Sequence, residues 1–175
     1  MVCLFDSLED AEAWQAEVYR HLPNLENDER FFGEQWLVDE FDEMISKESR
    51  LLLVSADLSV EAAVEGVARH GGLSIPAHVD RPAYSIIANL GFVPPDLGAA
   101  AVEISPRITP SEAVERFPQL KGMAMVASSD AHYLNDMKAR NTLRMAAPTL
   151  GELAKALAYR DGREMWIDGL RVPGF

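Results

Sequence analysis

The stretch that most constrains the fold is Met123–His132, MAMVASSDAH, in which small and apolar residues give way abruptly to polar ones. A run this apolar, preceded by a glycine, predicts a short buried strand. Asp130 and His132 would follow at its carboxyl end, where α/β folds form their pockets. Because these residues are two apart, an extended backbone would turn both to one side, where a carboxylate and an imidazole could bind a metal ion. A plain turn after a core strand would explain the same pair.

A second stretch, Gly71–Pro82 (GGLSIPAHVDRP), has the same order of residues: glycines that end a helix, a short apolar run, then polar side chains. His78, Asp80 and Arg81 follow the apolar run. In a parallel sheet, the two strands would place their polar groups along one rim. Strands and helices alternate through most of the chain, and this alternation predicts the α/β class.

Together the two stretches resemble metal-binding motifs of the PHP (polymerase and histidinol phosphatase) family. Ser129-Asp130-Ala131-His132 matches the family's SDAH motif, and Pro76-Ala77-His78 is similar to its AHP-like motif, with Val79 where proline is often found. The resemblance implies a distorted (β/α)7 barrel, of which this chain would be a partial or truncated form lacking the first βα units. The family's initial HxH motif is absent from this sequence. We therefore expect a shortened or split protein, or a start codon placed too late.

The resemblance also implies a chemistry, the hydrolysis of phosphate esters by water that clustered ions of zinc, manganese or iron activate. Carried over to this chain, His78, Asp130 and His132 would be metal ligands, and Asp130 and His132 would be the catalytic residues. Arg81 would bind the substrate phosphate, or would pair with nearby acidic groups. In the family pattern the three ligands serve different ions. We therefore expect substoichiometric metal and a weak or inactive isolated chain.

Two other interpretations stay open. The chain could be a non-catalytic subunit, derived from a PHP protein, that acts in binding or assembly. A serine hydrolase would have to use Ser128 or Ser129 with His132 and Asp130. Residues this close along one strand cannot easily supply a nucleophile, a base and an orienting group, so this interpretation is the least favoured.

The charge balance bears on possible partners. The chain has 16 Lys and Arg against 28 Asp and Glu, a net charge of −12, which opposes a phosphate backbone. We therefore expect no nucleic acid partner and a small phosphorylated substrate, whose charge local metal ions would offset. The sequence has no apolar run near ~18 residues and no signal-like start, so we expect a cytoplasmic protein with no membrane partner. The single cysteine, Cys3, excludes an internal disulfide.

We expect residues 1–175 to form one PHP-like domain, with an acidic hairpin inserted around residues 23–50. The carboxylates of its turn, residues 39–43, lack the glycine and the distal glutamate of an EF-hand loop. The apolar segments 2–5 and 51–56 would leave open strand edges, which predicts a homo-oligomer or a partner that carries the missing barrel half. Further strands are expected at 35–38, 44–46, 73–77, 100–105, 142–145 and around Asp168-Gly169, and helices at 8–22, 60–70, 81–90 and after Thr109 and Thr149.

Overall fold

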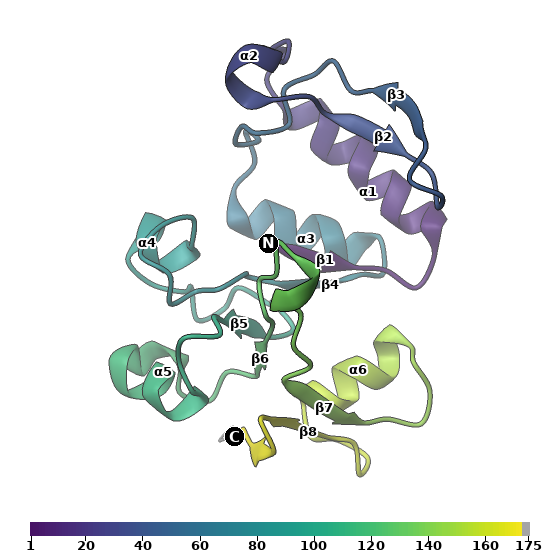
Figure 1. The fold of residues 1–175 in the computed structure, drawn as a ribbon. Helices are drawn as coiled ribbons and strands as arrows, with labels where there is room; N and C mark the ends of the chain where they lie inside the picture. The colour runs from purple at the N-terminus through teal and green to yellow at the C-terminus, as the bar shows by residue number, and fades with distance from the viewer. Residues whose placement is uncertain (173–175) are drawn as a thin grey trace.

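The computed structural model describes residues 1–172 as a mixed α/β structure with small sheets, and these residues form no closed barrel (Figure 1). The α/β class is therefore confirmed. The helices are α1 (Leu8–His21), α2 (Glu29–Phe32), α3 (Val60–Arg69), α4 (Ile86–Leu90), α5 (Pro110–Arg116) and α6 (Leu150–Leu157), with 3-10 turns η1 (Pro118–Leu120) and η2 (Leu134–Asp136). The strands are β1 (Val2–Leu4), β2 (Trp36–Val38), β3 (Met44–Lys47), β4 (Leu73–Ile75), β5 (Val102–Ile104), β6 (Met125–Ala127), β7 (Asn141–Arg144), β8 (Glu164–Ile167) and β9 (Leu170–Arg171).

Three strands run in one direction through the core. β5 and β6 pair in parallel, from Val102 opposite Met125 to Ile104 opposite Ala127. The chain from β4 onward lies along β5, because the Ala100 N–H donates to the Ser74 carbonyl at 3.0 Å and the Glu103 N–H to the Pro76 carbonyl at 2.9 Å. All residues of β5 are buried, as expected for a central strand. The carboxyl ends of β4, β5 and β6 therefore meet at one rim, as the sequence predicts.

The strand beside β4 differs from the expected one. β1 pairs antiparallel with β4, from Val2 opposite Ile75 to Leu4 opposite Leu73. The βαβ unit predicted over residues 51–77 does not form, because residues 51–56 are not a strand. Leu51 is buried, but Leu53 is exposed. The prediction of a strand at residues 51–56 was wrong. An apolar run of this length fits the pattern of a strand, but a strand forms only where a neighbouring strand can pair with it.

The helix ends follow their capping residues. Ser7 accepts a hydrogen bond from the Asp10 N–H at 3.1 Å and begins α1, and Thr109 forms the complete capping box that begins α5. The helix expected over residues 81–90 is shorter, because Ser85 is its N-cap and α4 covers only Ile86–Leu90. At the end of the described chain, the turn at Asp168-Gly169 joins β8 to β9 in a three-stranded antiparallel sheet with β7.

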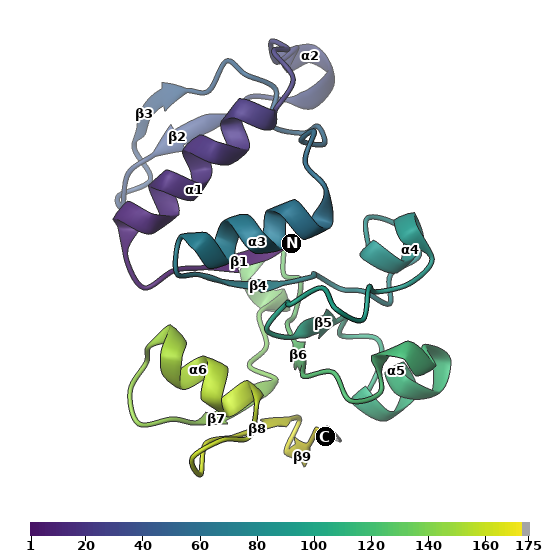
Figure 2. The ribbon, with the colours of Figure 1, turned by 180° about the vertical axis from the view of Figure 1, so that it is seen from behind.

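The predicted acidic hairpin is present as β2 and β3, with its turn at residues 39–43. It lies along α1, at the end of the molecule opposite α5 and α6 (Figures 1 and 2). The helix α1 is held to α3 by Trp14, whose ring covers Gly66; a Cβ on Gly66 would lie 2.3 Å from Trp14 Cζ3. No helix within residues 1–172 is both long and apolar enough to cross a membrane.

Candidate functional site at the strand ends

The SDAH segment leaves the strand before its polar residues. β6 ends at Ala127, and Asp130 has a left-handed backbone with φ of +51°. His132 is exposed, and its Nδ1 lies 2.9 Å from the backbone oxygen of Asp130. The prediction that an extended strand turns Asp130 and His132 to one side is therefore wrong. The left-handed backbone at Asp130 departs from an extended strand, so the alternation of side chains along a strand does not apply here.

Arg81 joins the two motifs. Its Nη1 forms an ion pair with Oδ2 of Asp130, although the two residues lie 49 positions apart. Both side chains are partly buried, so this pair is less screened than one on the open surface. The structure therefore brings the Gly71–Pro82 and Met123–His132 stretches together. Two roles were considered for Arg81, binding of a substrate phosphate and pairing with an acidic group. In this structure Arg81 pairs with an acidic group, Asp130.

His78 is not part of this ion pair, although its backbone oxygen accepts a hydrogen bond of 3.0 Å from the Arg81 N–H. It is half-buried, its backbone φ is +32°, and it does not line the pocket that holds Asp130 and His132. Its Nδ1 is buried and has no hydrogen-bond partner within the described chain. A buried nitrogen without a partner costs about 1–3 kcal/mol, so this position favours a ligand or a further polar group.

Residues 1–172 do not complete a metal centre. In residues 1–172, no group of three or more His, Cys, Asp or Glu side chains is placed to hold an ion. His78 would fit a ligand role through its unpartnered nitrogen, but Asp130 is already neutralised by Arg81. Zinc usually has three or four protein ligands, so the ligands that these residues offer are too few to bind a zinc ion firmly.

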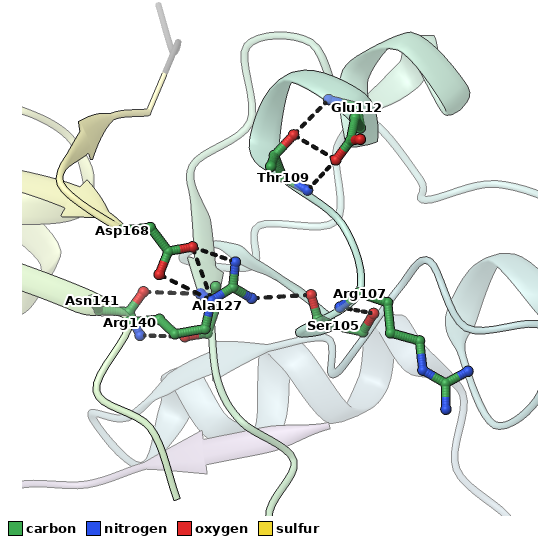
Figure 3. A network of polar contacts seen from close by, with 8 residues as sticks. All are labelled: Ser105, Arg107, Thr109, Glu112, Ala127, Arg140, Asn141 and Asp168. Atoms are coloured by element: carbon green, nitrogen blue, oxygen red, sulfur yellow. Dashed lines mark hydrogen bonds and ion pairs between the residues drawn. The ribbon is translucent and has the colours of Figure 1, made fainter. Parts of the chain in front are cut away.

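A pocket of about 390 Å³ opens at the ends of β5 and β6. It contains three cationic side chains and two carboxylates. Arg107 and Lys138 are exposed, and neither side chain forms an ion pair or hydrogen bond with the described residues. Figure 3 shows the Arg107 guanidinium directed away from the neighbouring polar network. The pocket is lined by Arg81, Ser105, Pro106, Arg107, Ser129, Asp130, His132, Asn135, Asp136 and Lys138.

Buried polar contacts fix the rim of this pocket. Asp80 accepts two hydrogen bonds of 2.6 Å, from the N–H and the hydroxyl of Ser105, and both residues are buried. The Arg140 Nη1 donates to the Ser105 carbonyl at 3.2 Å, while its Nη2 lies 2.6 Å from Oδ2 of Asp168. This guanidinium lowers the pKa of Asp168. The rim at the end of β5 is therefore held by both Asp80 and Arg140, and Figure 3 shows the contact with Arg140.

Asn141 fixes the end of β6 in a similar way. Its amide accepts from the Ala127 N–H at 2.9 Å and donates to the Ala127 carbonyl at 2.8 Å, as a neighbouring strand would (Figure 3). Sequence reasoning missed Asn141, Arg107 and Lys138. No motif contains them, and the two cations lie in loops between elements, where neither strand nor helix periodicity applies.

No protein-family model matches the chain, and no curated protein matches it either. Among solved structures, it is similar to the lesion-specific endonuclease PfuEndoQ from Pyrococcus furiosus, with a TM-score of 0.60 and 18% sequence identity. The fold is shared. The similarity covers 93% of this chain and 36% of the endonuclease, so the chain spans about a third of that protein.

This similarity corrects the expected partners. We expected the net charge to exclude nucleic acid and to favour a small phosphorylated substrate. A protein that contains this fold is described as an endonuclease, an enzyme that cleaves nucleic acid, so the expectation is contradicted. The physical reason is that a net charge sums over the whole surface, whereas a ligand meets the local field. In this chain the pocket presents Arg107 and Lys138 despite the net charge of −12.

Proposed function

We propose that this chain is part of a PHP-type phosphoesterase whose substrate is a phosphodiester in nucleic acid. The observation that carries the proposal is the pair of free cations, Arg107 and Lys138, in a pocket at the strand ends beside the Arg81–Asp130 pair. Arginine and lysine donors of this kind bind phosphate oxygens. The SDAH and Pro76-Ala77-His78 motifs and the fold shared with an endonuclease support the family assignment.

Within this proposal, His78, Asp130 and His132 are the metal-binding positions that this chain contributes, with Asp130 and His132 as the catalytic residues. The described residues do not complete a metal centre. Further ligands must therefore come from another segment or another chain. The isolated chain is then expected to bind nucleic acid without cleaving it.

A second candidate is nucleic acid binding without any catalytic role, and the Arg81–Asp130 ion pair favours it. An aspartate engaged by an arginine is a poor metal ligand, since the cation competes for the same oxygens. In this case the pocket would hold a phosphate with Arg107 and Lys138, and Arg81 would stay paired. The two candidates agree on the ligand and differ on whether Asp130 can bind a metal.

The ligand is tested by fluorescence anisotropy with labelled single-stranded and duplex oligonucleotides over a range of salt concentrations. The double variant Arg107→Ala/Lys138→Ala should lose about tenfold or more in affinity at low salt. The slope of log affinity against log salt should fall by about two, one unit for each phosphate contact. The matched control is Arg20→Ala/Lys121→Ala, which removes two exposed cations away from the pocket. An equal loss in the control, or no binding by the unaltered chain, would contradict the proposal.

The catalytic part is tested by metal binding rather than by turnover. Arg81→Met releases the Asp130 carboxylate, so calorimetric titration with Mn²⁺ or Zn²⁺ should show tighter binding than in the unaltered chain. Adding Asp130→Asn to that variant should remove the gain. A gain that persists without Asp130, or no gain at all, would reject the metal role of Asp130 and leave the binding candidate.

A further inference from the structure

The segment of residues 24–50, here called the hairpin segment, contains α2, β2 and β3 and has no buried residue. A folded segment of this size normally buries at least one face of its strands. Monomeric proteins rarely expose large contiguous apolar patches, and those that do use them for binding. Here every large apolar side chain is exposed, from Trp36 at 39% to Phe31 at 79%; these residues are Leu25, Phe31, Phe32, Trp36, Leu37, Val38, Phe41, Met44 and Ile45.

The same segment is strongly acidic. It contains nine Asp and Glu against three Lys and Arg, a net charge of −6, which is half of the chain's −12. Its cations are already engaged: Arg30 pairs with Asp28, and Lys47 pairs with Glu29 and Glu34. Arg50 donates to the backbone oxygen of Tyr19. The charge that the hairpin segment presents to a partner is therefore negative.

The turn of the hairpin presents this charge in a fixed geometry. Asp39 Oδ1 accepts hydrogen bonds of 2.9 Å from the N–H groups of both Phe41 and Glu43. Glu40, Asp42 and Glu43 form no ion pair with the described residues, and the adjacent Phe41 is 76% exposed. Carboxylates and an aromatic ring thus share one exposed turn.

We propose that the hairpin segment is a docking surface for a basic, amphipathic polypeptide segment. Exposed apolar side chains would bury the apolar face of such a partner, and the unpaired carboxylates would contact its lysine and arginine side chains. The negative charge of the hairpin segment argues against a second copy of this chain, a lipid surface or nucleic acid as the partner. A second copy would bring two segments of −6 together, and both an anionic lipid surface and nucleic acid would be repelled. This inference does not depend on the function proposed for the pocket.

The test uses a synthetic amphipathic peptide of leucine and lysine, about four helical turns long. The matched probes are the same pattern with glutamate for lysine and a scrambled leucine–lysine peptide of equal composition. Calorimetry at near-physiological salt should show binding of the patterned lysine peptide only. Hydrogen exchange should then locate protection within residues 24–50.

Two variants separate charge from apolar contact. Glu40→Gln/Asp42→Asn/Glu43→Gln should weaken the lysine peptide about tenfold, with a reduced dependence on salt. Phe41→Ser/Ile45→Ser should weaken it by a similar factor, because burial of one large apolar side chain corresponds to tenfold or more. All five side chains are exposed, so the fold should not depend on them.

The control variant neutralises exposed carboxylates on α1 and α3, as Glu9→Gln/Glu12→Gln/Glu61→Gln. Less than a twofold change is expected. An equal loss in this control, or protection outside the hairpin segment, would overturn the proposal, because the peptide would then be responding to overall charge. A dimer in light scattering that becomes a monomer in Phe41→Ser/Ile45→Ser would also overturn it, in favour of a second copy of this chain.

Discussion

Replacing Asp80 by alanine should destabilise the fold more than most single substitutions. The Asp80 carboxylate is 7% exposed and accepts 2.6 Å hydrogen bonds from the N–H and the hydroxyl of Ser105, which is 1% exposed. Hydrogen bonds to a charged group contribute about 1.5–3 kcal/mol each, and alanine would leave two buried donors without an acceptor. The expected loss is therefore about 3–5 kcal/mol. Domains are stable by only about 5–15 kcal/mol, so this is a large fraction of the free energy of unfolding.

Urea denaturation measures this loss. With an m-value of about 2 kcal/mol/M, the unfolding midpoint of Asp80→Ala should fall by about 1.5–2.5 M. Asp80→Asn keeps one acceptor oxygen for Ser105 and should lose about half as much. Asp96→Ala is the control, because Asp96 is exposed in the loop before β5, and its effect should stay within about 0.5 kcal/mol. An Asp80→Ala midpoint equal to that of the control would refute the reasoning, since Ser105 would then have reached water or another acceptor.

Three further results are expected. Gly66→Ala places a Cβ 2.3 Å from the Trp14 ring and should lower the free energy of unfolding by about 1–3 kcal/mol. Gly151→Ala, in open space within α6, should instead raise it by about 0.5–1 kcal/mol; equal effects on the urea midpoint would contradict this. A hydrogen bond from Arg163 lowers the pKa of Glu152 from 4.5 to about 2, so its stabilising effect is complete above about pH 4.5 and is lost as the pH falls toward 2. Glu152→Gln should reduce the acid-induced loss of stability over that range in urea titrations at several pH values. Elemental analysis of the purified chain should find at most one divalent ion per molecule, and three stoichiometric ions would show a complete centre.

Local signals in the sequence were sufficient for much of the secondary structure. The Ser7 and Thr109 caps mark the starts of α1 and α5, and the Asp168-Gly169 turn joins two paired strands. These features depend on residues within one turn of each other. The strand expected over residues 51–56 failed because pairing depends on a distant neighbour. β4 pairs with β1, about 70 residues away in the sequence, and no local pattern specifies that choice.

The candidate site was also predicted only in part. The sequence placed the two polar stretches at one rim, and the Arg81–Asp130 ion pair shows that they meet. It did not predict that His78 would be absent from the lining of the pocket that holds Asp130 and His132. It also missed Arg107 and Lys138. Exposed cations in loops follow no periodic pattern, so their convergence can be seen only in three dimensions.

The distribution of charge explains how an acidic chain can have the ligand that we propose for the pocket. Half of the net charge lies in residues 24–50, at the end of the molecule opposite α5 (Figure 2). The pocket lies beside the connection from β5 to α5 and includes Arg107. At physiological ionic strength the Debye length is about 8 Å, so exposed carboxylates at the far end contribute little to the potential at the pocket. A phosphate there would mainly sense Arg107, Lys138, the Asp136 carboxylate and the Arg81–Asp130 pair. An acidic chain can therefore contain a local site for an anion. Its acidic hairpin segment, far from that site, can at the same time bind a partner of opposite charge.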